Sequence, residues 1–60
     1  MNAYIKEIKE EFKKNMEYVD KELMTAYPNA DRDSIKYAII TKIANDYAIT
    51  PYQVKKMVEQ

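Results

Sequence analysis

Few side chains in this sequence are of a type that could carry out chemistry on a substrate. The chain has no cysteine and no histidine, which excludes thiol and imidazole catalysis and Cys/His metal sites. Ser34 is the only serine, and no histidine is present to activate its hydroxyl. The neighbouring carboxylates Glu7, Glu10 and Glu11 fit a solvated helix face better than an acid–base pair. We therefore expect no enzymatic activity and no small-molecule substrate.

Asp31 and Asp33 have a spacing that is similar to the start of a calcium-binding loop. The glycine and the terminal glutamate of such a loop are missing here. Either aspartate can instead accept hydrogen bonds from the first free N–H groups of a helix. We therefore expect a helix cap at this position, and we expect neither a metal nor another cofactor.

The charges of the chain are balanced. Its 60 residues suit one small domain and include ten Lys and Arg residues against ten Asp and Glu residues. This zero net charge counts against a free-standing nucleic-acid binder, although residues 31–60 carry one more basic than acidic side chain. No apolar run approaches the roughly 20 residues that span a membrane. We expect a cytoplasmic protein, and the composition would suit a bacterial or phage accessory protein.

The elements that position these side chains are predicted by the apolar spacing. It indicates a single all-α domain, residues 1–60, with helices at about residues 3–26, 33–47 and 51–59. The first helix carries one apolar stripe with a residue at every third or fourth position, formed by Ile5, Ile8, Phe12, Met16, Val19, Leu23 and Tyr27. Pro28 ends this helix, because a proline disfavours helical backbone at the residue before it.

The other two helices have different patterns. The second is apolar over much more than one stripe, as expected of a helix that neighbours cover on two sides. The third has a strong start signal, with Thr50 as N-cap, Pro51 in the first turn and Gln53 completing a capping box. Ile49 can pack on Val54 before this cap as a hydrophobic staple. A helix this short is marginal alone, so the capping also has a purely structural explanation.

The stretch "ITKIANDYAITPYQVKKMV" resembles the helix-turn-helix of DNA-binding regulators. Ile43 and Ala44 match the family's apolar–Ala pair in the first helix of the motif. Ile49 matches the aliphatic residue after the turn and Thr50 the cap, while Val54 and Met57 match the buried positions of the recognition helix, in a resemblance that covers residues 41–58. The family usually has glycine at the turn, where this chain has Ala48, and a non-glycine residue at positive φ is strained by about 1 kcal/mol or more.

The resemblance implies that the third helix enters the major groove of duplex DNA. The residues that it places on the DNA side are Thr50, Pro51, Tyr52, Gln53, Lys55 and Lys56. Gln53 suits adenine, a lysine suits guanine or a phosphate, and Tyr52 suits a phosphate or a thymine methyl. A structural explanation stays open for each: the glutamine completes the cap, the lysines solvate a face, and the tyrosine packs at the core edge.

The first helix is too long for the other two to cover, at about 36 Å for 24 residues. We expect the uncovered part of its stripe, at Ile5, Ile8 and Phe12, to form an interface, most simply with a second copy. The function hypothesis is a small regulator that binds duplex DNA as a homodimer. The alternative is a protein-interaction module, such as an inhibitor or anti-repressor, that uses the first or third helix.

Overall fold

The computed structural model describes residues 4–60, which form an all-α fold of three helices without a strand. The long N-terminal helix runs from Ile5 to Ala26 in three consecutive segments: α1 (Ile5–Tyr18), the π-helical η1 (Val19–Leu23) and α2 (Met24–Ala26). It is followed by α3 (Arg32–Asp46) and α4 (Pro51–Val58). The predicted fold class is confirmed, whereas the predicted helix start at Ala3 lies outside the described residues.

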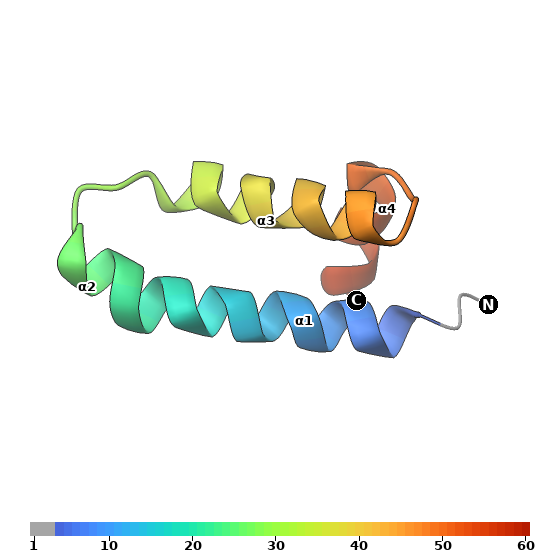
Figure 1. The fold of residues 1–60 in the computed structure, drawn as a ribbon, viewed down its shortest axis with the longest axis horizontal. Coiled ribbons are helices and arrows are strands. Elements are labelled where there is room, and N and C mark those ends of the chain that lie inside the picture. The colour runs from blue at the N-terminus through green and yellow to red at the C-terminus, as the bar shows by residue number, and fades with distance from the viewer. Residues whose placement is uncertain (1–3) are drawn as a thin grey trace.

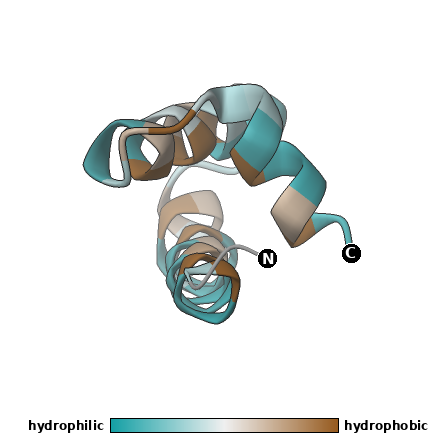
Figure 2. Ribbon diagram, turned by 90° about the vertical axis from the view of Figure 1, so that its right-hand side faces the viewer, coloured by the Kyte–Doolittle hydropathy of each residue, from teal (hydrophilic) through white to brown (hydrophobic). Residues whose placement is uncertain are grey.

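The long helix and α3 lie antiparallel, and α4 crosses one end of the pair (Figure 1). The molecule is elongated, with extents of 38 × 19 × 16 Å. A view along α1 shows α3 and α4 on adjacent sides of it, with apolar segments turned toward the space between them (Figure 2). All three helices therefore meet only at the end of the molecule that holds α4.

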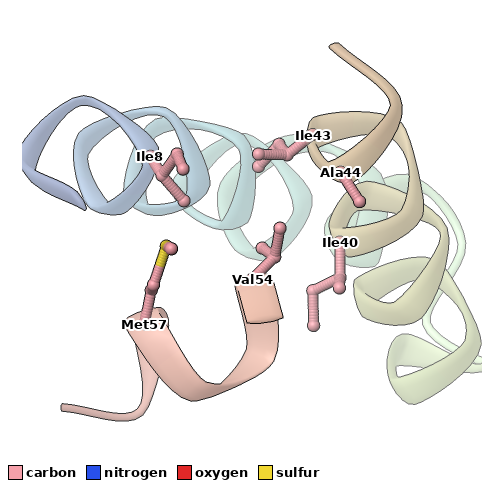
Figure 3. Close-up of a cluster of buried hydrophobic side chains, with 6 residues drawn as sticks. All are labelled: Ile8, Ile40, Ile43, Ala44, Val54 and Met57. Atoms are coloured by element: carbon pink, nitrogen blue, oxygen red, sulfur yellow. The ribbon is translucent and has the colours of Figure 1, made fainter. Parts of the chain in front are cut away.

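The core lies where these helices meet. It consists of six buried side chains from all three helices, shown in Figure 3: Ile8, Ile40, Ile43, Ala44, Val54 and Met57. Ile8, Ala44 and Val54 are completely buried. Full burial of a side chain as large as Ile8 contributes about 1.5–3 kcal/mol to folding. The short α4 thus supplies a third wall for a core that two helices alone would leave open.

The burial of Ile8 corrects the expectation about an uncovered patch. Ile5, Ile8 and Phe12 were expected to lie on the free part of the first stripe, yet Ile8 has no exposed surface and the other two pack against the core. The reason is that α4 turns back across the start of α1, so the N-terminal part of the long helix is covered by both α3 and α4. The prediction that Ile8 contacts a second copy is therefore wrong, because its side chain is not exposed.

The wide η1 turn is a second departure from the expected regular α-helix. The N–H of Met24 donates to the carbonyl of Val19, five residues earlier, which is the π-helical pattern. The hydroxyl of Thr25 donates to the carbonyl of Lys21 at 2.8 Å. The helix then ends at Ala26, with Tyr27 at φ −132°, as the following Pro28 predicts.

Toward the end of the molecule away from α4, charged side chains add to the burial of Met16 and Val19. The guanidinium of Arg32 donates to both carboxylate oxygens of Asp20, at 2.7 and 3.1 Å, which joins α3 to η1. Asp31, and not Asp33, caps α3: it accepts from the N–H groups of Asp33 and Ser34 and from the Ser34 hydroxyl. Both capping candidates were predicted, and the structure selects the first.

These contacts make the fold sensitive to acid. The Arg32 hydrogen bond holds the pKa of Asp20 below its usual value, and hydrogen bonds from Ser34 do the same for the pKa of Asp31. Because each carboxyl binds its proton more weakly in the folded chain, the stability is fully present above the unfolded pKa of about 4 and is lost as pH falls through the folded pKa.

We therefore expect Asp20→Asn to be less stable than the parent chain at pH 7, with the difference shrinking below about pH 4. Thermal unfolding followed by circular dichroism across this range measures it. Glu22→Gln is the matched control, because Glu22 lies on the same turn and makes no ion pair among the described residues. Equal stability of Asp20→Asn and the parent at pH 7 would contradict the role given to the Arg32 contact.

Candidate functional site

The candidate site is built on the turn between α3 and α4. The N–H of Ile49 donates to the Ala44 carbonyl at 3.0 Å, and the N–H of Ala48 donates to the Asn45 carbonyl at 3.3 Å. These two bonds form a Schellman motif, in which the residue after the helix cap adopts a left-handed conformation. Ala48 has φ 56°, the conformation that was predicted to be strained at this position. The motif ends α3 and redirects the chain into α4.

The residues behind the turn pack as the apolar spacing predicts. Ile43 and Ala44 on α3 are buried, as are Val54 and Met57 on α4, and Ile49 packs against this core from the turn. Ala44 is completely buried between neighbours, so its small side chain lets the two helices approach closely. The α3–α4 pair is therefore a rigid support for whatever α4 presents on its other side.

The cap of α4 occupies two of the predicted DNA contacts. The N–H of Gln53 donates to the Thr50 hydroxyl at 3.1 Å, and the N–H of Thr50 donates to the Gln53 side-chain carbonyl at 2.9 Å. The predicted capping box is thus confirmed. A bidentate contact of Gln53 with adenine needs this same carbonyl as an acceptor, so it would break the cap. Only the amide N–H groups of Gln53 stay available as donors.

The outward face of α4 carries an aromatic ring and two cations. Tyr52 is 66% exposed, and Lys55 and Lys56 are exposed beside it. The ammonium of Lys56 lies 5.4 Å from the centre of the Tyr52 ring, a distance at which a cation–π attraction acts. This contact restricts the position of Lys56, while Lys55 lines two hollows together with Tyr37 and Ile40 of α3. Of the predicted contacts, these three are the exposed side chains that take no part in the cap.

A groove between α4 and α3 extends this face. Tyr37 and Ile40 of α3 line a hollow of about 230 Å³ together with Pro51, Tyr52 and Lys55. Tyr37 is 62% exposed. Tyr37 was not predicted to belong to the site. It lies one helical turn before the buried Ile40, and this position indicates a place in the groove only when the crossing angle of α3 and α4 is already known.

The groove changes character toward the C-terminal end of α4. A second hollow, of about 210 Å³, shares Tyr37, Ile40 and Lys55 with the first. It adds Lys36, which the sequence analysis also missed, and the acidic side chains of Asp33 and Glu59. The cations therefore stand alone near Pro51 and Tyr52, and both signs of charge occur further along.

Other kinds of site find little support in the described part of the chain. Among residues 4–60 no group of three acidic side chains is arranged to hold a metal ion. No helix formed by these residues has the length and apolar character to cross a membrane. Comparison with protein-family models, with curated proteins and with solved structures gives no match to this chain. The interpretation of the site therefore depends on its own geometry.

The strain at the turn leads to a stability test. We expect Ala48→Gly to raise the free energy of unfolding by about 1 kcal/mol, because glycine adopts positive φ without the clash of a Cβ atom. Urea unfolding followed by circular dichroism measures the change. Ala38→Gly is the matched control, since Ala38 is exposed within α3, and it should lower the stability by about 1 kcal/mol. A loss of stability in both variants would show that the left-handed turn is not strained.

Proposed function

We propose that this chain is a small, non-enzymatic regulator that binds duplex DNA through α4, as a pair of copies. The observation that supports this most is the α3–α4 pair, in which a left-handed Schellman turn and a capped, rigidly packed α4 leave Tyr52, Lys55 and Lys56 facing outward. A helix held in this way is the feature that helix-turn-helix proteins insert into the major groove.

The dimensions of α4 suit this role. An α-helix with its side chains is about 10–12 Å across, and the major groove is about 12 Å wide, so α4 can lie in it. In the proposed complex Lys55 contacts a guanine edge or a phosphate, and the Tyr52 hydroxyl donates to a phosphate. Lys56 adds a second cation beside the ring. Thr50 and Gln53 mainly hold the start of the helix, since the side chain of each accepts a hydrogen bond from the backbone N–H of the other.

The mixture of basic and acidic side chains along the groove limits how tightly one copy can bind DNA. The face offers Lys36, Lys55 and Lys56, but Asp33 and Glu59 lie along the same groove. Affinity for DNA that does not depend on sequence comes from the number of phosphates that basic side chains neutralise. One copy supplies few such contacts, so two copies are needed for useful affinity. A regulator of this type would act in the cytoplasm of a bacterium or of a cell infected by a phage.

Binding to a protein through the same face is the second candidate function. Exposed Tyr37 and Tyr52 flank an apolar floor formed by Ile40, and aromatic side chains are enriched at the centres of protein interfaces. Both signs of charge nearby and the zero net charge of the chain also suit a protein partner. In this role the chain would act as an inhibitor or anti-repressor.

A salt-dependent binding experiment separates the two functions. The anisotropy of a labelled random-sequence duplex is measured against protein concentration at about 50 and 200 mM salt. If binding depends on phosphate contacts, the higher salt concentration must weaken it by roughly tenfold or more. We expect Lys55→Glu/Lys56→Glu to abolish binding at both concentrations, because it replaces both attractions with repulsions. Circular dichroism checks that the variant is folded.

The control is the double reversal Lys14→Glu/Lys21→Glu, which changes the net charge equally on exposed positions of the long helix, away from α4. It should keep most of the binding if the α4 face is responsible. Equal loss in both variants would indicate a general effect of charge. No binding of the folded parent chain at the lower salt concentration would contradict the DNA proposal and favour a protein partner.

A further inference from the structure

Another hollow lies along the long helix and shares only Val58 with the α3–α4 groove. Its volume is about 430 Å³. Val58, near the end of α4, forms one edge. The rest of the lining comes from one stripe of the long helix: Lys9, Phe12, Lys13, Met16, Glu17 and Asp20. We call these six residues the long-helix face.

The charges of the long-helix face are sorted by sign. Lys9 and Lys13 lie toward its N-terminal end, Glu17 and Asp20 lie toward its C-terminal end, and Phe12 and Met16 form the apolar floor between them. Lys13 and Glu17 are exposed, and among the described residues neither takes part in an ion pair. A face that is positive at one end and negative at the other is complementary to a copy of itself turned by half a rotation.

We infer that the long-helix face binds a second copy of this chain in an antiparallel arrangement. Lys13 of one copy then lies opposite Glu17 of the other, and the two-fold symmetry forms this pair twice. One turn further out, Lys9 lies opposite Asp20 of the other copy. A parallel arrangement is disfavoured, because it places Lys13 against Lys13 and Glu17 against Glu17.

The two kinds of pair are not equal. Asp20 is already bound by Arg32, and Lys9 donates to the backbone carbonyl of Gln60 at 3.5 Å. The pairs between Lys13 and Glu17 therefore determine the orientation. Apolar contact comes from Phe12, which is half-buried, and from Val58. Phe12 thus belongs both to this interface and to the one that the sequence predicted, whereas the buried Ile8 does not belong to this interface.

This inference is independent of DNA binding, so it is tested on the protein alone. Sedimentation equilibrium of the parent chain is measured from about 10 µM to 1 mM, the range suited to a small interface. We expect the parent to dimerise, and Lys13→Glu or Glu17→Lys alone to weaken the dimer about tenfold, because each turns two attractive pairs into repulsive ones.

Restoring the charge pairs must restore the dimer. The swap Lys13→Glu/Glu17→Lys should dimerise like the parent, and a mixture of the two single variants should form a mixed dimer. Lys14→Glu is the control, since Lys14 is exposed outside the long-helix face and its reversal should leave the dimer unchanged. A parent that stays monomeric up to the highest concentration, or single variants that dimerise like the parent, would overturn the inference. All four variants are checked by circular dichroism.

Discussion

The packing of α4 across one end of the pair formed by the long helix and α3 is the contact on which the rest of this structure depends. Val54 and Met57 reach the core from a helix of only eight residues, and they cover Ile8 of the long helix and Ile40 and Ile43 of α3. Two helices alone would bury too little apolar surface in a chain of this size. The capping box at Thr50 and the Schellman turn at Ala48 hold α4 at the required angle, so local backbone chemistry determines whether the core closes.

The same contacts decide which side chains are left for function. Folding uses the inner residues of α4 for the core and the pair Thr50 and Gln53 for the cap. Apart from these, the exposed side chains of α4 are those of Tyr52, Lys55 and Lys56, and Glu59 follows the helix as its C-cap. Tyr37 and Lys36 join this face from α3, because the steep crossing brings that part of α3 beside Tyr52 and Lys55.

Local features of this fold could be predicted from the sequence, and features that depend on helix crossing could not. The apolar spacing, Pro28 and the Thr50–Gln53 pair act within one helix or turn, and the structure has them as expected except at Tyr27, which follows the helix end and is 66% exposed. The covering of Ile8 and the assignment of Tyr37 to the groove depend on the direction in which α4 leaves the turn, which no spacing within one helix encodes. The π turn at Val19–Leu23 changes which backbone carbonyl one N–H bonds to, while the apolar spacing in the sequence continues through it. The sequence therefore did not indicate the π turn.

The two proposed surfaces are compatible because they share only Val58, which edges the hollow along the long helix and also lines the second hollow of the α3–α4 groove. Pro51 and Tyr52 line the part of the groove near the start of α4, and neither borders the long-helix face. Pairing of two copies through the long helix would therefore leave both starts of α4 free. Because one copy offers few cations to a phosphate backbone, its affinity for DNA is low, and linking two copies makes the second contact intramolecular. DNA binding by this chain would then rise with the fraction of paired molecules, so its occupancy on DNA would depend more steeply on protein concentration than that of a monomer.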